Sequence, residues 1–94
     1  MSSTSLRSKA PLKIRRVVGH SMEPGLRQNQ LVLASGWLVP TDGSIVVAVI
    51  EDGVEVVKRL SVATQSLSGD NQADSQNYSL DRVVDIATVL WPVK

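Results

Sequence analysis

A lysine inside a strongly apolar stretch is the first residue of this sequence whose setting could support chemistry. Residues 54–60 read Val-Glu-Val-Val-Lys-Arg-Leu, and their β-branched content and alternation predict a β-strand. Side chains alternate between the faces of a strand, so the more apolar face, which we expect to pack inward, holds Val54, Val56, Lys58 and Leu60. Burial disfavours an ammonium ion and lowers the pKa of a lysine, which would make Lys58 a base near neutral pH. Because a strand lysine more often extends its charge to water, this interpretation requires a chemical partner.

A serine in a glycine- and proline-rich turn is the best candidate for that partner. Residues 19–25 read Gly-His-Ser-Met-Glu-Pro-Gly, a composition that predicts a turn able to present Ser21 from a rigid support. A serine hydroxyl becomes an effective nucleophile when a neighbouring base removes its proton, and a desolvated lysine can do this. His20 is adjacent in sequence, but neighbouring side chains in an extended segment diverge. We therefore expect His20 at the surface and Lys58 as the base.

Composition excludes several other kinds of chemistry. The chain has no cysteine and one histidine, so we expect no disulfide, no metal site and no cofactor. Three carboxylates, Asp70, Asp74 and Asp81, lie in or near a polar stretch where solvated acids are common, and we do not interpret them as a catalytic pair. With two tryptophans, one tyrosine and no phenylalanine, stacking on nucleic-acid bases is not expected. No apolar run is long enough to span a bilayer or form a signal-peptide core, so the sequence as written predicts a soluble protein.

Charge is distributed unevenly along the chain. Residues 1–22 carry five basic side chains and no acid, whereas residues 23–94 carry five basic side chains and nine acids. A basic, serine-rich leader can make peripheral contact with an anionic membrane surface or with nucleic acid, but such a segment is more commonly a solvated tail. We expect residues 1–12 to be a basic flexible tail and residues 13–94 to form a single β domain.

The elements that must position Ser21 and Lys58 are short strands. A hairpin is predicted where residues 44–50, a β-branched run, reach the lysine strand through Glu51-Asp52-Gly53. Residues 67–78 are rich in Gly, Asp, Asn and Ser and predict a polar loop, and no stretch of useful length shows helical periodicity. We therefore expect an all-β fold, a small barrel or coiled sheet with little or no helix in which early and late strands pair. The remaining predicted strands are residues 13–18, 31–35 and 83–91.

Three short motifs in this order resemble the signal peptidase I and LexA-like family of Ser/Lys proteases. They are Gly-His-Ser-Met-Glu-Pro at residues 19–24, Val-Lys-Arg-Leu at 57–60 and Gly-Asp-Asn at 69–71. Lys58 follows Ser21 by 37 positions, a spacing that suits compact members of the family. The resemblance spans residues 17–92 and implies the all-β catalytic domain of that family.

The resemblance also implies roles for individual residues. Ser21 would be the nucleophile, with its own backbone N–H as an oxyanion donor, and Lys58 would be the general base. Ser75, six residues after Gly69, would orient the lysine. Other family positions would shape or stabilise the active-site loops, and these are Gly19, Met22, Pro24, Gly69, Asp70 and Asn71.

The sequence departs from the family pattern at three places. Gly19 stands where some signal peptidases have a hydroxyl donor to the oxyanion. Asn77-Tyr78-Ser79 replaces the Asp-Ser-Arg run of signal peptidases, and Asn29-Gln30 replaces a common Gly-Asp. The last two departures concern the fine positioning of Lys58, and both members of the dyad are in place.

The function implied is a serine endopeptidase that removes an N-terminal signal or pro-segment from another protein after a small residue. Its substrate would bind as an extended peptide beside a strand. Two alternatives remain open at this stage. One is a LexA-like self-cleaving regulator, although no Ala-Gly bond precedes Ser21. The other is a non-catalytic β-domain binding module that retains Ser21 and Lys58 as remnants.

Overall fold

A single curled β-sheet forms most of the molecule. The computed structural model describes residues 12–74 and 76–92, so most of the predicted basic tail lies outside the described residues. In this part of the chain the sheet has seven strands in the order β1-β2-β7-β3-β4-β5-β6, with two single-turn 3₁₀ helices and no α-helix. The all-β prediction is confirmed. The elements are β1 (Leu12–Arg16), β2 (Leu31–Ser35), β3 (Ile45–Ile50), β4 (Glu55–Ser61), β5 (Ser66–Ser68), η1 (Gln72–Asp74), β6 (Tyr78–Ser79), η2 (Leu80–Arg82) and β7 (Val83–Trp91).

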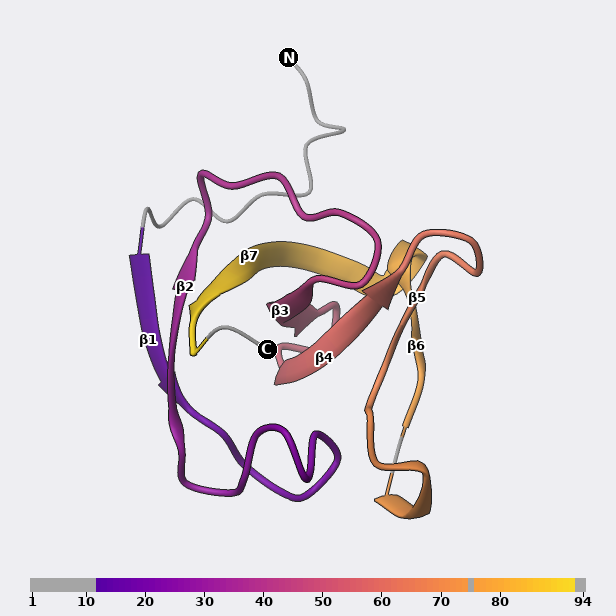
Figure 1. Cartoon of the computed structure of the whole chain (residues 1–94). Helices are drawn as coiled ribbons and strands as arrows, with labels where there is room; N and C mark the ends of the chain where they lie inside the picture. The colour runs from indigo at the N-terminus through magenta and orange to yellow at the C-terminus, as the bar shows by residue number, and fades with distance from the viewer. Residues whose placement is uncertain (1–11, 75, 93–94) are drawn as a thin grey trace.

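Strand β7 joins the two halves of the sheet. It pairs antiparallel with β2 on one side and with β3 on the other, so early and late strands pair as predicted. Figure 1 shows β1 and β2 on one side of the molecule and β5 and β6 on the other, with β7, β3 and β4 between them. The sheet is therefore bent into a half-barrel.

The β3–β4 hairpin is also confirmed. Its register runs from Ile45 opposite Arg59 to Val49 opposite Glu55, and the turn contains Gly53 with a φ of +90°. This left-handed conformation favours glycine, because it brings the Cβ of other residues too close to the backbone. The hairpin places Lys58 opposite Val46 on β3.

Strand β3 is buried on both of its faces, which explains its continuous run of β-branched and small apolar residues. Ile45 and Val47 belong to a first apolar cluster, and Val46, Ala48 and Ile50 belong to a second one. The other buried members of the first cluster are Val17, Met22, Leu26, Val32, Ala34 and Ala87. Those of the second cluster are Leu60, Leu67, Val83 and Ile86.

Two details of the sequence-based prediction are wrong. The segment predicted as a polar loop contains β5, η1 and β6, because a single apolar residue, the fully buried Leu67, anchors β5 opposite Leu60. A strand of three residues is too short to show the alternation of apolar and polar side chains from which a strand is predicted. Val54, expected to face inward, is 48% exposed because it belongs to the hairpin turn before β4 begins. Lys58 and Leu60 are buried as predicted.

Besides β6 at the other end of the strand order, two stretches of the described sheet have an edge with no strand beside it. Strand β1 stands at one end of the strand order. Strand β4 pairs with β5 only from Arg59 to Ser61, so the edge of its first half, residues 55–58, has no strand beside it. None of the described helices is long and apolar enough to cross a membrane.

Candidate functional site

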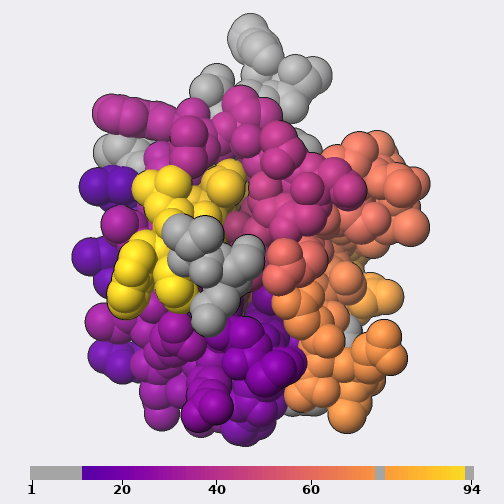
Figure 2. All heavy atoms as spheres, viewed as in Figure 1, coloured from indigo at the N-terminus to yellow at the C-terminus, as the bar shows by residue number. Residues whose placement is uncertain are grey.

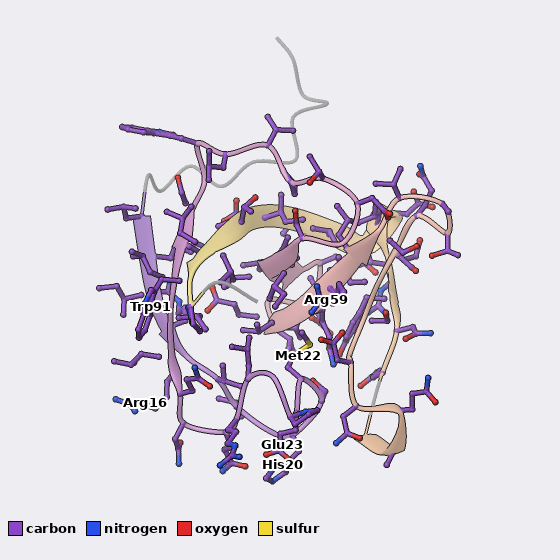
Figure 3. The ribbon with its side chains drawn as sticks, in the orientation of Figure 1. Arg16, His20, Met22, Glu23, Arg59 and Trp91 are labelled. Carbon is purple, nitrogen blue, oxygen red and sulfur yellow. The ribbon has the colours of Figure 1, made fainter. Side chains whose placement is uncertain are left out.

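The turn that carries Ser21 is fixed to the molecule by its apolar side chains. Met22 and Leu26 are essentially fully buried in the first apolar cluster, and the amide of Leu26 donates to the carbonyl of Met22 at 3.0 Å. Figure 3 shows Met22 pointing into the molecule, whereas His20 and Glu23 lie together at its rim. Gly19 opens the turn with a φ of +86°. Buried anchors therefore hold a half-buried Ser21 at a defined position.

The Gly-Asp-Asn segment packs directly on the backbone of this turn. A Cβ placed on Gly69 would lie 2.6 Å from the carbonyl oxygen of Ser21 and 2.9 Å from its Cβ, so only glycine fits without a shift. The amide of Asn71 donates to the Ser21 carbonyl at 2.7 Å, and its side-chain Nδ2 donates to the His20 carbonyl at 3.0 Å. Figure 2 shows the violet turn region and the orange loop side by side. The two motifs are thus joined through main-chain contacts.

An ion pair connects the same loop to the lysine strand. Arg59, next to Lys58 on β4, donates from Nε and Nη2 to the two carboxylate oxygens of Asp70 at 2.8 and 2.7 Å. Its Nη1 also donates to the carbonyl of Gly43 at 2.7 Å. The hydrogen bond that Arg59 donates to Asp70 raises the pKa of Arg59 above its ordinary value, and burial opposes this only in part. The loop that packs on Ser21 is therefore fixed to the strand that carries Lys58.

A cleft of about 410 Å³ contains both Ser21 and Lys58 in its wall. Residues of β1 and of the segment that follows it form one bank, and the unpaired edge of β4 forms the other. Lys58 is 5% exposed, so its side chain is almost entirely removed from water. The lining residues are Arg15, Arg16, Val18, Ser21, Glu55, Val56, Val57, Lys58 and Tyr78.

Ion pairs connect β1, which forms one bank of the cleft, with β4 and β7. Arg15 Nε on β1 lies 2.6 Å from Glu55 Oε1 on β4. Lys13, which is 8% exposed, places Nζ 3.4 Å from Glu55 Oε2 and 3.2 Å from Asp85 Oδ2 on β7. Glu55 and Asp85 flank Val49 in the strand register, so a single lysine can reach both carboxylates.

Other residues considered from the sequence lie apart from this chemistry. His20 is exposed, and its Nδ1 is 2.7 Å from Glu23 Oε2, so it lies at the surface as expected. Pro24 is exposed on the same turn. Ser75, expected to orient the lysine, lies outside the described residues. Among the residues that are described, no group of three or more His, Cys, Asp or Glu side chains could hold a metal ion.

Sequence reasoning missed several residues of the site. Tyr78, noted only as a departure from a motif, lines the cleft, and Arg82 stacks over its ring at 5.8 Å from the centroid. The contribution of Arg59 was also missed, although its position beside Lys58 in a shared motif was a usable signal. The Arg15–Glu55 contact could not be found from a motif in the sequence, because it depends on how far the sheet curls.

The fold and the cleft place this chain in the class of all-β domains that have a serine and a buried lysine lining one cleft. In agreement with this class, the family model described as Peptidase S24-like matches residues 1–85. The chain therefore belongs to the Peptidase S24-like family. No curated protein and no solved structure gives a significant match to the chain.

Proposed function

We propose that this protein is a serine endopeptidase that uses Ser21 as nucleophile and Lys58 as general base. Its reaction would remove an N-terminal signal or pro-segment from another protein after a small residue. The observation that carries the proposal is that Ser21 and Lys58 line one cleft while Lys58 is 5% exposed. Membership of a peptidase family supports the same interpretation.

The proposed reaction is acyl transfer in two halves. The neutral Lys58 amine accepts the Ser21 hydroxyl proton as Oγ attacks the scissile carbonyl carbon, and the backbone N–H of Ser21 donates to the oxyanion. The lysine then returns the proton to the leaving nitrogen, the C–N bond breaks and an acyl-enzyme remains. Water, deprotonated by Lys58, attacks the ester, and the Ser21 hydroxyl is restored. General-base assistance of this kind typically contributes about 10²–10⁴-fold to the rate.

Burial explains why a lysine can serve as the base. Desolvation disfavours the ammonium form, so a buried lysine holds its proton less tightly than one in water. A neutral amine is then available without strongly alkaline conditions. Preorganisation by the Arg59–Asp70 ion pair and by the close approach of Gly69 to Ser21 would keep the nucleophile and base at a fixed separation.

The unpaired edges of β1 and β4 supply a binding mode for the substrate. The cleft lies between these two edges, and an extended peptide entering it can add a strand to the sheet through main-chain hydrogen bonds. Val18, Val56 and Val57 give the cleft short apolar surfaces near Ser21 and Lys58. These surfaces suit a substrate segment with small apolar side chains.

Cleavage of a peptide library by three variants across pH 6–10 tests the proposal. We expect cleavage after small residues by the unchanged protein, and its loss in both Ser21→Ala and Lys58→Met, because each variant removes one half of the dyad. Ser61→Ala is the matched control, since Ser61 is half-buried on β4 and does not line the cleft. Full activity in either dyad variant would contradict the proposal. Failure of the folded, unchanged protein to cleave any peptide would favour the non-catalytic binding module.

A further inference from the structure

The cleft is bridged by an ion pair whose two members come from its opposite banks. Arg15 on β1 and Glu55 on β4 both line the cleft, and they are joined at 2.6 Å. Of the cleft-lining residues on β1, Arg15 is the farthest in sequence from Ser21. Of those on β4, Glu55 is the farthest in sequence from Lys58. Along both strands the bridge is therefore displaced in sequence from the proposed dyad.

Surrounding groups hold this bridge in place. Arg15 also donates from Nη1 to the carbonyl of Ile14 at 3.0 Å, and Glu55 is shared with the buried Lys13, which in turn contacts Asp85. Arg15 and Glu55 are already paired with each other, and Glu55 also accepts from Lys13. We therefore interpret the bridge as a barrier and not as a site that recognises a charged side chain.

Strand alternation explains why Arg15 and not its neighbour forms the bridge. Lys13 and Arg15 alternate with Ile14 and Arg16 along β1, and both reach Glu55 on β4. Arg16 donates to the carbonyl of Asn29 at 2.8 Å and lies at the outer edge of the molecule in Figure 3. The barrier is thus specific to the Arg15 side chain.

We propose that the Arg15–Glu55 ion pair sets the end of the substrate-binding cleft and thereby limits how much of an extended peptide the protein engages. This inference rests on the proposed peptidase function and specifies its substrate class. Glu55 precedes Lys58 by three residues, which is about 10 Å of extended chain. The protein therefore engages about three residues on one side of the scissile bond, and longer peptides gain nothing there.

Peptides of graded length test the limit. The starting probe is the best-cleaved library peptide, extended by one alanine at a time on either side of the cleaved bond. With the unchanged protein, kcat/KM should rise over about three residues on one side and then level off. In Arg15→Ala the rise should continue past that point by at least about threefold, the contribution of roughly one added main-chain hydrogen bond. Arg15→Lys keeps a cation that can reach Glu55 and should restore the original limit.

A control separates the barrier from a merely stabilising ion pair. Glu51→Ala removes another exposed ion pair, that with Arg82 at 3.1 Å, outside the cleft. It should lower stability about as much as Arg15→Ala without changing the length dependence. An unchanged length limit in Arg15→Ala would overturn the proposal while leaving the peptidase function intact.

Binding of the same peptides to Ser21→Ala, measured by calorimetry, separates this proposal from the catalytic one. Affinity that levels off at about three residues, and extends in the Ser21→Ala/Arg15→Ala double variant, would support the barrier even if the unchanged protein cleaves nothing. Affinity that rises steadily with length in Ser21→Ala would overturn it. Absence of both binding and cleavage would overturn the peptide-binding cleft and the barrier together.

Discussion

Arg59 and Asp70 form a two-pronged ion pair, with Nε–Oδ1 and Nη2–Oδ2 distances of 2.8 and 2.7 Å. The pair joins the strand that carries Lys58 to the loop that packs on Ser21. The two candidate catalytic residues lie on different segments, and this contact joins the strand of one to the loop that packs on the other. It has the parallel geometry that makes arginine–carboxylate pairs both stronger and more directional than single contacts.

Removing the carboxylate should weaken both stability and activity. Asp70→Ala leaves Arg59 without its main partner, and we expect the free energy of unfolding to fall by about 1 kcal/mol, since partly exposed pairs are screened by water. Activity should fall by about tenfold, because the loop against Ser21 loses its connection to β4. Denaturant unfolding and kcat/KM measure the two effects. Asp81→Ala, on the short helix η2 and outside the cleft, is the control that should change neither. Undiminished activity in Asp70→Ala would contradict a positioning role.

A methyl group at position 69 should disrupt the site through overpacking. Gly69→Ala places a Cβ 2.6 Å from the Ser21 carbonyl oxygen, and a backbone contact of this kind cannot be relieved by a side-chain rotation. We expect a loss of about 1–3 kcal/mol in stability and a larger proportional loss of activity, as the turn must shift. Gly25→Ala is the matched control on the same turn, because its Cβ would meet the Met22 carbonyl at an ordinary 3.7 Å. Thermal unfolding and peptide cleavage compare the two variants, and equal effects would refute the close-approach argument.

The activity should rise with pH on the alkaline side of neutral. In the proposed mechanism only the neutral Lys58 amine is competent, so the rate follows its deprotonation. The Arg59–Asp70 pair does not obscure this measurement. The hydrogen bond to Asp70 raises the pKa of Arg59 in the folded protein. The stability that the pair contributes is therefore fully present at any pH below the ordinary arginine pKa. It is lost only as the pH rises through the still higher pKa of the folded state. Stability measured in parallel from pH 6 to 10 should therefore not fall through loss of the Arg59 charge, and an acidic activity optimum would contradict the mechanism.

Much of the fold is predictable because its long strands are apolar and β-branched. Strands at residues 31–35 and 83–91 have the predicted bounds, and the hairpin follows from a turn between two such runs. The short strands β5 and β6 are not predictable in this way, because two or three residues contain no period. The pairing of Leu67 with Leu60 defines β5, and it exists only after the chain has folded back.

The candidate site likewise has residues that the sequence predicts and contacts that it does not predict. Ser21 and Lys58 stand out by turn chemistry and by a cation in an apolar strand, and both line the same cleft. The contacts that fix them do not stand out. Arg59–Asp70 and Arg15–Glu55 join residues 11 and 40 positions apart, and each depends on the curvature that brings separate strands together. Sequence patterning encodes which face of a strand is buried, but it contains no direct measure of that curvature.

The position of β7 has a consequence for how the cleft comes into existence during synthesis. Residues 83–91 form the strand that pairs with both β2 and β3, so a nascent chain that ends before them carries Ser21 and Lys58 on two pieces of sheet with no strand ladder between them. Pairing of this kind between distant segments forms late and slowly, because a long loop must close first. A nascent chain from which residues 83–91 have not yet emerged would therefore lack the assembled cleft, and competence to bind peptides would appear only after β7 has inserted.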